Sequence, residues 1–344
     1  MSALGMAVVG CGYWGPNLVR NIVACPQTRL VRACDVDAAR LAEVLAPYPG
    51  VQACTELAEV LADEQVTAVA IATPVATHHA LARECLLAGR HVLVEKPMAA
   101  TVAQAEDLVA LARERSLRLM CDHVFCYAPV VRVMKDIIDA GSLGDVLYFD
   151  SVRINLGLFQ RDVNVIWDLA PHDLSILEYL TGRQPVAVSV QAARHAGWEQ
   201  ENMAYVALDF DNGFLAHLHL NWLSPVKIRK TIIGGSERML VWNDLDPAER
   251  LKVYDKGVTI QPRPDRAARD TALVSYRTGG VTSPHVPHGE ALAGVVAEFA
   301  AAVAEKRAPL TDGASGARML RILEAAQQSV ARGGARVPVA GEGA

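Results

Sequence analysis

Residues 6–15 read MAVVGCGYWG, a short apolar strand that opens directly into a glycine-rich turn. The turn has GxGxxG spacing, and a helical pattern of apolar residues follows it. In this context Gly10 permits the tight turn, Gly12 lets a pyrophosphate approach the backbone, and Gly15 lets helix and strand pack closely. The first N–H groups of the following helix would attract the phosphates. The stretch therefore predicts a dinucleotide-binding strand–turn–helix unit.

A second apolar strand, Leu30–Cys34, ends at Asp35. This aspartate lies about 20 residues beyond the last glycine, where a carboxylate that binds ribose is expected. A carboxylate there accepts hydrogen bonds from a 2′-hydroxyl and repels a 2′-phosphate. The sequence therefore predicts NAD as the cofactor and makes NADP less favourable, although Arg40 nearby works against that preference.

Strands and helices continue to alternate up to residue 122. The apolar runs Ala68–Ala72, His91–Val94 and Leu117–Cys121 are separated by helical patterns. Such alternation is typical of a parallel, doubly wound α/β sheet, so residues 1–122 are expected to form a Rossmann domain. Because the carboxyl ends of parallel strands share one rim, we expect a group of residues there to contact the cofactor: Gly10, Gly12, Tyr13, Trp14, Gly15, Asp35, Thr73, Pro74, His78, Glu95, Lys96 and Pro97.

The stretch HVLVEKPM, residues 91–98, ends its strand in a charged pair and a proline. Proline has no N–H for the sheet, so the strand stops there. It also keeps Lys96 out of the helical region, and we predict a cis bond between Lys96 and Pro97. The alternative is a solvated strand end with an ordinary Glu–Lys pair.

Strand patterns dominate after a helix predicted at Pro129–Ala140. Consecutive strands without intervening helices imply an antiparallel sheet, so residues 123–344 are expected to form a second, α+β domain. Asn212-Gly213 supplies the turn of one hairpin. The expected strands are Val146–Asn155, Val186–Ala192, Ala204–Phe210, Phe214–Leu220, Lys227–Ile233 and Met239–Asn243, and amphipathic helices are expected at Ala291–Val303 and Ala314–Val330.

The segment WDLAPHD, residues 167–173, leads into a helix predicted at Leu174–Leu180. If Asp168 and His172 are both helical, they stand one turn apart on one face, with Pro171 near the helix start. A neutral histidine is a suitable general base. In the alternative, Asp168 is a helix N-cap and His172 is a buried polar residue. Spacing alone favours that alternative.

Together these motifs resemble the glucose–fructose oxidoreductase / inositol dehydrogenase (Gfo/Idh/MocA) family. The resemblance covers nearly the whole chain, and Glu-Lys-Pro after the Rossmann unit is its most specific mark. It implies that Lys96 lies beside the nicotinamide and the substrate hydroxyl, and that Asp168 and His172 match the family's catalytic pair. We expect His172 to act as the base, Lys96 to polarise the reacting oxygen, and Asp168 to orient the sugar or tune His172. Lys96 and His172 could exchange roles.

The substrate expected from this resemblance is a sugar that is linked to a nucleotide and oxidised at C3. The motifs are similar to those of 3-dehydrogenases of UDP-N-acetyl-hexosamines. The alternatives are an inositol or aminocyclitol dehydrogenase, an NAD-dependent glycosidase, and a cofactor-binding sensor without chemistry. Six residues have side chains that can pair with vicinal hydroxyls or pack on a sugar face, and we expect them to contact the substrate: Arg153, Asn155, Asn164, Tyr127, Trp222 and Lys227. Each of them could equally be a core or surface residue.

Composition limits the other possibilities. The chain has 344 residues, which suggests two domains, and a net charge of −5, which gives no reason to expect nucleic acid or an anionic membrane as a partner. Seven cysteines form no CxxC pair and no zinc spacing, so we expect no metal and buried thiols in a reducing cytoplasm. The resemblance implies a homodimer or homotetramer formed through the C-terminal sheet.

Overall fold

The computed structural model describes residues 3–157, 159, 163–261 and 273–341. The chain divides into two compact units. The first unit comprises Met1–Ala128 and Gly289–Glu324, and the second comprises Pro129–His288 and Ala325–Ala344. The sequence predicted a single boundary after residue 122. In the structure, a segment near the C-terminus instead returns to the first unit.

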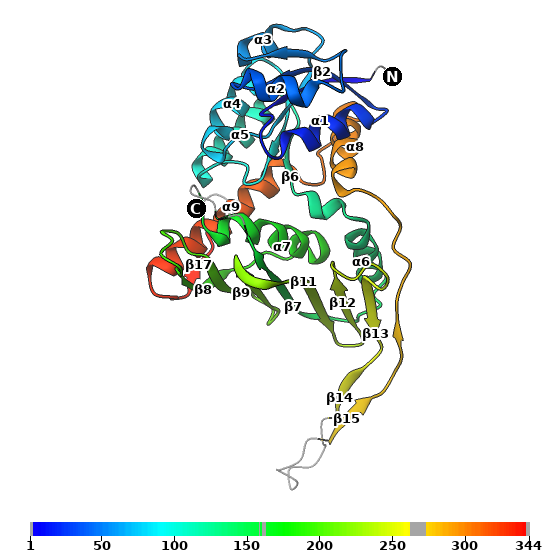
Figure 1. Ribbon diagram of the computed structural model, residues 1–344. Helices are drawn as coiled ribbons and strands as arrows, with labels where there is room; N and C mark the ends of the chain where they lie inside the picture. The colour runs from blue at the N-terminus through cyan, green and yellow to red at the C-terminus, as the bar shows by residue number, and fades with distance from the viewer. Residues whose placement is uncertain (1–2, 158, 160–162, 262–272, 342–344) are drawn as a thin grey trace. The chain divides into compact units, whose positions relative to one another are not determined.

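The first unit contains a six-stranded parallel sheet with the strand order β3-β2-β1-β4-β5-β6. Helices cover the sheet in the doubly wound arrangement expected from the alternating sequence pattern (Figure 1). The strands are β1 (Leu4–Val9), β2 (Thr28–Cys34), β3 (Gln52–Cys54), β4 (Ala68–Ile71), β5 (His91–Glu95) and β6 (Leu119–Asp122). The helices between them are α1 (Gly15–Ala24), α2 (Ala38–Leu45), α3 (Leu57–Ala62), α4 (Val75–Leu87) and α5 (Val102–Glu114), and a 3-10 helix, η1 (Val124–Tyr127), follows β6.

The central strands of this sheet are buried on both faces. All four residues of β4 are buried, as are five of the six residues of β1. This explains why these strands read as continuous apolar runs rather than as alternating ones. Side-chain caps fix the starts of two helices: Asp37 accepts hydrogen bonds at the start of α2, and Thr101 accepts one at the start of α5.

Helix α8 (Ala291–Ala304) completes the first unit. Glu290, which precedes it, forms a two-pronged ion pair with Arg20 of α1, with N–O distances of 2.6 and 2.8 Å. Tyr127 of η1 reaches the hydroxyl of Thr311 at 3.0 Å. These contacts attach the returning segment to the Rossmann sheet and its helices.

The second unit contains a nine-stranded sheet with the order β16-β13-β12-β11-β7-β10-β9-β8-β17. Helix α7 (Val165–Thr181) lies across one face of this sheet, next to α6 (Pro129–Asp139) (Figure 1). The long strands are β7 (Val146–Leu156), β8 (Ala187–Ala193), β9 (Met203–Asp209), β10 (Leu215–Asn221), β11 (Leu223–Gly235) and β12 (Met239–Asn243). Shorter strands are β13 (Leu251–Tyr254), β16 (Val281–Thr282) and β17 (Val337–Pro338).

This sheet is mainly antiparallel, as predicted, but β7 and β10 at its centre run parallel. The chain leaves β7 through α7, forms β8 and β9, and returns as β10 beside β7. Residues in β10 alternate between buried and partly exposed, so the strand has one face in the core. The ribbon of β14 (Gly257–Gln261) and β15 (Leu273–Arg277), the short strands β13, β16 and β17, and β3 of the first unit were not predicted from the sequence.

Two further helix assignments complete the fold. The predicted C-terminal helices are present as α8 and as α9 (Gly313–Ala331). Among the residues that the structure describes, no helix is both long and apolar enough to cross a membrane. All seven cysteines are free thiols.

Candidate functional site

The glycine turn after β1 has the shape that a pyrophosphate requires. Gly10 has φ +94°, and a Cβ there would lie 2.6 Å from the carbonyl oxygen of Ala72. A Cβ on Gly15 would lie 2.0 Å from the carbonyl oxygen of Gly10, whereas a Cβ on Gly12 would meet nothing within 4 Å. The first and third glycines are therefore needed for packing, and the middle one leaves the backbone open to a ligand. These residues fit the phosphates of a dinucleotide at the start of α1.

Asp35 follows β2 and lies against the same turn. Its Oδ2 accepts a hydrogen bond from the Cys11 N–H at 2.5 Å, and its Oδ1 accepts one from the Asp37 N–H at 2.9 Å. Arg40 donates to the carbonyl oxygens of Cys11 and Gly12, at 3.2 and 3.3 Å. Asp35, the predicted ribose ligand, is therefore adjacent to the glycine turn. Arg40, which was expected to weaken the preference for NAD over NADP, lies there too.

The side chain of His78 connects the segments that follow β4 and β5. It is 1% exposed, and its ring nitrogens lie 2.8 Å from the carbonyl oxygens of Pro97 and Thr73. Both partners only accept hydrogen bonds, so a neutral ring satisfies one of them at a time, while burial lowers the pKa of His78. His78, predicted to touch the cofactor, thus fixes the turn that carries Lys96. The predicted cis bond between Lys96 and Pro97 is confirmed.

A pair of carboxyl groups lies at the ends of β5 and β6. Glu95 and Asp122 are register partners on the two neighbouring parallel strands. Asp122 is 2% exposed, and Oε1 of Glu95 is shielded from solvent. Burial, together with the charge of Asp122, raises the pKa of Glu95 well above its usual value, and burial also raises the pKa of Asp122. Burial and mutual repulsion therefore oppose ionisation of the two carboxyls together.

In the second unit, α7 carries the predicted catalytic pair. Asn164 is its N-cap and accepts hydrogen bonds from the N–H groups of Ile166 and Trp167, both at 3.1 Å. The helix therefore begins nine residues earlier than the predicted Leu174, and Pro171 lies inside it rather than near its start. Asp168 and His172 are both helical and stand one turn apart, as the sequence argument required. Asp168 is not the N-cap.

Trp222 holds Asp168 from the neighbouring sheet. Its indole N–H donates to Oδ2 of Asp168 over 3.2 Å, and its ring is 1% exposed. A Cβ on Gly157 would lie 2.5 Å from this ring, so the backbone there packs directly on it. Trp222 was predicted to pack on a sugar face. Its burial instead makes it a support for the Asp168 carboxylate.

The other predicted substrate residues fall into two groups. Arg153 forms a buried two-pronged ion pair with Asp173 of α7, with N–O distances of 2.7 and 3.1 Å. Asn164 is occupied as the N-cap and donates to Glu201 and Gln327, and Tyr127 is buried in the first unit. Only Asn155, which is partly exposed, and Lys227, which is exposed, remain open to a small molecule.

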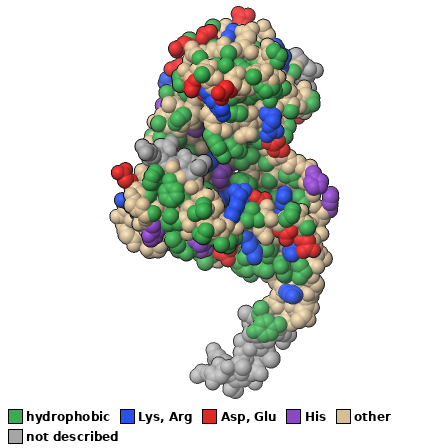
Figure 2. All heavy atoms as spheres, in the orientation of Figure 1, with side chains coloured by type: hydrophobic (Ala, Val, Ile, Leu, Met, Phe, Trp, Pro, Cys, Tyr) green, Lys and Arg blue, Asp and Glu red, His purple; other side chains and the backbone are tan. Residues whose placement is uncertain are grey.

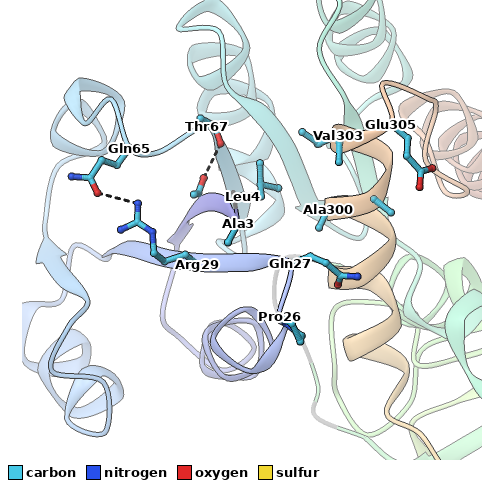
Figure 3. Close-up of a pocket in the computed structure, with 13 residues that line it drawn as sticks. Ala3, Leu4, Pro26, Gln27, Arg29, Gln65, Thr67, Ala300, Val303 and Glu305 are labelled. Atoms are coloured by element: carbon cyan, nitrogen blue, oxygen red, sulfur yellow. Dashed lines mark hydrogen bonds between the residues drawn. The ribbon is translucent and has the colours of Figure 1, made fainter. Parts of the chain in front are cut away.

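A groove of about 800 Å³ lies elsewhere on the first unit. Figure 3 shows it between the amino ends of β1, β2 and β4 and the small apolar side chains of α8. Arg29 and Gln65, which line it, are hydrogen-bonded to each other at 3.0 Å. Because parallel sheets bind ligands at the carboxyl ends of their strands, this groove is not the dinucleotide site.

On the face shown in Figure 2, acidic and basic side chains are intermixed.

Comparison with known proteins places this geometry in a family. The profile described as "Oxidoreductase family, NAD-binding Rossmann fold" (GFO_IDH_MocA) matches residues 4–123, and the profile of the GFO/IDH/MocA C-terminal domain matches residues 131–241. A UDP-N-acetylglucosamine 3-dehydrogenase of Acidithiobacillus ferrooxidans is 30% identical over 324 residues, covering 91% of this chain and 93% of the relative. The chain belongs to the Gfo/Idh/MocA family. It is an NAD-dependent oxidoreductase with a Rossmann domain.

Other members of the Gfo/Idh/MocA family show similar likeness. Inositol 2-dehydrogenase 2 of Saccharopolyspora erythraea is 28% identical over 225 residues, which cover 63% of this chain and 66% of the relative. The solved structure of the Acidithiobacillus ferrooxidans enzyme GnnA has a TM-score of 0.78 and 26% identity, covering 96% of this chain and 100% of that one. GenD2 from gentamicin A biosynthesis, solved with NAD, shares the fold with a TM-score of 0.82 at 24% identity, over 99% of this chain and 97% of its own.

Two residues of the first unit's rim were not predicted from the sequence. Asp122 ends β6 just as Asp35 follows β2, so the rule that a polar residue after a buried strand reaches the rim would have found it. His123 is 2% exposed, and neither ring nitrogen has a hydrogen-bond partner among the residues that the structure describes. Burial and the Lys96 charge lower the pKa of His123 to about 4. Only the tertiary structure reveals that it is buried beside Lys96.

Proposed function

We propose that this chain oxidises a secondary ring hydroxyl of a sugar, at C3 of a nucleotide-linked N-acetylated amino sugar, with NAD as hydride acceptor. Two facts support the proposal. A UDP-N-acetylglucosamine 3-dehydrogenase resembles the chain over almost its full length. The chain also retains the Lys96, Asp168 and His172 set that the family resemblance associates with alcohol oxidation.

The reaction needs a base for the hydroxyl proton and a cation near the oxygen that gains charge. In this proposal His172 takes the proton, and Lys96 stabilises the reacting oxygen. Asp168 orients the sugar or tunes His172. NAD supplies only the hydride acceptor, so all proton movement falls to side chains of the chain itself.

The observation that carries the proposal is the fixed geometry of Asp168. This partly exposed carboxylate stands one turn before His172 on α7, and the indole N–H of Trp222 holds it at 3.2 Å. A carboxylate that served only to cap the helix would lie at position 164, which Asn164 occupies. The Asp168 carboxylate thus does not cap the helix and is held in a defined position, as a substrate or base partner should be.

The test is a substrate panel followed by NADH absorbance. Purified protein with NAD is given UDP-N-acetylglucosamine, UDP-glucose, a dTDP-sugar and myo-inositol separately. We expect the fastest NADH formation with UDP-N-acetylglucosamine, and mass spectrometry should show a product two hydrogen masses lighter. His172→Ala should lower kcat by about 100-fold or more, since general bases contribute roughly that much, whereas exchange of the exposed histidine in His288→Ala should not.

Inositol oxidation is the second candidate, because inositol 2-dehydrogenases are also among the relatives. Their match covers less of this chain than that of the 3-dehydrogenase. Faster NADH formation with myo-inositol than with every nucleotide sugar would replace the first proposal with this one. Release of free sugar without net NADH would contradict both and favour an NAD-dependent glycosidase.

A further inference from the structure

The carboxyl pair of Glu95 and Asp122 is not explained by hydride transfer or by binding of the dinucleotide phosphates. The two residues sit opposite each other in the parallel register of β5 and β6, at the last position of each strand. Since side chains of register partners point to the same face of a sheet, the two carboxyl groups lie side by side. Both oxygens of Asp122 and Oε1 of Glu95 are buried and have no hydrogen-bond partner in the described residues.

Two buried carboxylates that lie side by side on neighbouring strands repel each other strongly. The repulsion and the loss of solvation are relieved when the pair keeps one proton, which leaves a single shared negative charge. The backbone N–H of Lys96 donates to Oε2 of Glu95 at 3.2 Å, but burial remains the largest influence on the pKa of both carboxyls. Trp14 brings an indole N–H near Asp122, outside ordinary hydrogen-bond geometry, and Lys96 is the cation that acts on both carboxyls.

The pair lies on the side of the sheet where the nicotinamide half of NAD belongs. The glycine turn follows β1, and Asp35, the ribose ligand, follows β2 on one side of it. A dinucleotide bound across a doubly wound sheet places its other half over the strands on the opposite side, which here are β4, β5 and β6. Glu95 and Asp122 end two of these three strands. The ring of oxidised nicotinamide carries a positive charge, and that of the reduced form does not.

We propose that Glu95 and Asp122 hold one proton between them, and that they release it to solvent when NAD⁺, but not NADH, binds. A nearby positive charge stabilises the fully ionised pair, which otherwise repels itself. Oxidation of a hydroxyl gives one hydride to the cofactor and one proton to the protein. Since the cofactor loses its charge in that step, the pair can take up one proton again. Over a complete cycle one proton leaves for each hydride transferred, which balances the reaction.

Among the described residues, the other titratable groups beside the pair or its immediate neighbours are Lys96, Cys121, His123, Cys126 and Tyr127. His123 carries no proton to release near neutral pH, because its pKa is lowered to about 4. Burial raises the pKa of the Cys121 thiol and of the Tyr127 hydroxyl, so both stay protonated. Lys96 is therefore the main rival source of a proton, and a variant can separate it from the pair.

The test is isothermal titration calorimetry of NAD⁺, NADH and ADP-ribose near pH 7.5, in buffers with different ionisation enthalpies. The dependence of the observed heat on the buffer gives the number of protons released. We expect NAD⁺ to release about one proton more than NADH does. ADP-ribose, which lacks the nicotinamide, should behave like NADH. No sugar is needed, so a negative result would overturn this inference, which rests on NAD binding, and leave the proposed sugar oxidation standing.

Amino-acid substitutions test which side chain releases the proton when NAD⁺ binds. Asp122→Asn and Glu95→Gln should each abolish the difference between NAD⁺ and NADH, because the remaining carboxylate has no second carboxylate to repel it and stays ionised beside Lys96 before the cofactor binds. Lys96→Met should keep the difference, and its loss there would assign the proton to Lys96 and overturn the proposal. Asp63→Asn, which alters a partly buried ion pair with Arg32 in the same unit, is the matched control and should keep it.

Should both pair variants fail to fold, the wild-type protein still decides the matter. Release of a proton with NAD⁺ alone requires the ratio of the NADH Kd to the NAD⁺ Kd to rise with pH, by up to tenfold per pH unit at about one proton. A ratio that stays constant from pH 6 to pH 9, or equal proton release with NAD⁺, NADH and ADP-ribose, would overturn the proposal.

Discussion

Asp35 stabilises the fold around the glycine turn, and we propose that it also binds the ribose of the cofactor. It holds the glycine turn through the Cys11 N–H and its own loop through the Asp37 N–H. A carboxylate has lone pairs left after these two bonds, so it can still accept hydrogen bonds from a ribose. Its charge also disfavours a 2′-phosphate. Arg40 on the same turn reduces this electrostatic preference.

Asp35→Asn should therefore weaken NADH binding by about tenfold, because a hydrogen bond to a charged group is worth more than one to a neutral group. NADPH binding should weaken less or improve, since the repulsion of its 2′-phosphate is gone. Fluorescence titration of both cofactors measures this. Asp37→Asn, which keeps an oxygen to cap α2, is the matched control. A variant Asp35→Asn that bound NADH as tightly as the wild type would contradict the ribose role.

The buried side chain of His123 should make the free energy of unfolding depend on pH. Its pKa is about 4 in the folded protein, below the ordinary 6.5, because burial and the Lys96 charge oppose protonation. The unfolded chain therefore binds more protons at this histidine below pH 6.5. The stability that the neutral side chain contributes is complete above pH 6.5 and is lost as the pH falls toward 4. This trend is opposite to that expected from Glu95, whose pKa is raised.

His123→Asn should remove this loss of stability. Between pH 6.5 and pH 5 the free energy of unfolding of the wild type should fall by roughly 2 kcal/mol more than that of the variant. Urea unfolding at both pH values provides the measurement. His288→Ala, at an exposed histidine, should match the wild type at both. Parallel pH curves for His123→Asn and the wild type would show that His123 is not held neutral.

At the scale of elements, α7 and the sheet beneath it support the proposed catalytic pair, Asp168 and His172. The N-cap Asn164 fixes the start of the helix, and the left-handed Gly182, with φ +66°, ends it. The buried ion pair of Arg153 and Asp173 attaches the helix to β7. Because removing one partner of such a pair leaves an uncompensated charge, these residues are structural rather than open to a substrate.

Trp222→Phe tests this support directly. The change keeps an aromatic ring and removes the N–H that holds Asp168. We expect kcat to fall by about tenfold, the equivalent of roughly 1.4 kcal/mol, with a smaller change in KM for NAD and in Tm. Trp242→Phe, at a buried indole in β12 of the same sheet, is the control. Equal kinetic effects of the two substitutions would indicate a general packing role for Trp222.

At the scale of the whole molecule, the chain returns to its first unit after completing most of the second. Gly289–Glu324 belongs with the Rossmann sheet. Its contacts include the Arg20–Glu290 ion pair and the backbone bond from the Cys121 N–H to the Thr311 carbonyl, at 2.9 Å. A domain cut from the sequence at a single boundary would lack this segment.

A fragment of residues 1–128 should accordingly be unstable, because α1 and η1 would lose the apolar side chains of α8. A fusion of residues 1–128 to 289–324 through a short flexible linker should fold cooperatively and bind NADH. Circular dichroism melting and cofactor fluorescence compare the two. Equal melting temperatures would mean that the returning segment contributes no stability to the Rossmann unit.

The sequence by itself determined the class of both sheets, the glycine turn, the position of Asp35 and the end of β5 before Pro97. These features depend on local rules: apolar periodicity, the freedom of glycine and the restraint of proline. The spacing of Asp168 and His172 predicted that they share one helix face, but only the family resemblance marked them as a candidate catalytic pair.

Only the tertiary structure decided which polar side chains are already occupied. Arg153, Asn164 and Trp222 looked suitable for a sugar, but each has a partner from a distant part of the chain. The pairing of Glu95 with Asp122 depends on the register of β5 and β6. Partners and register are set by how the whole chain packs, and burial then changes the chemistry of each group. A pattern along the sequence does not contain that information.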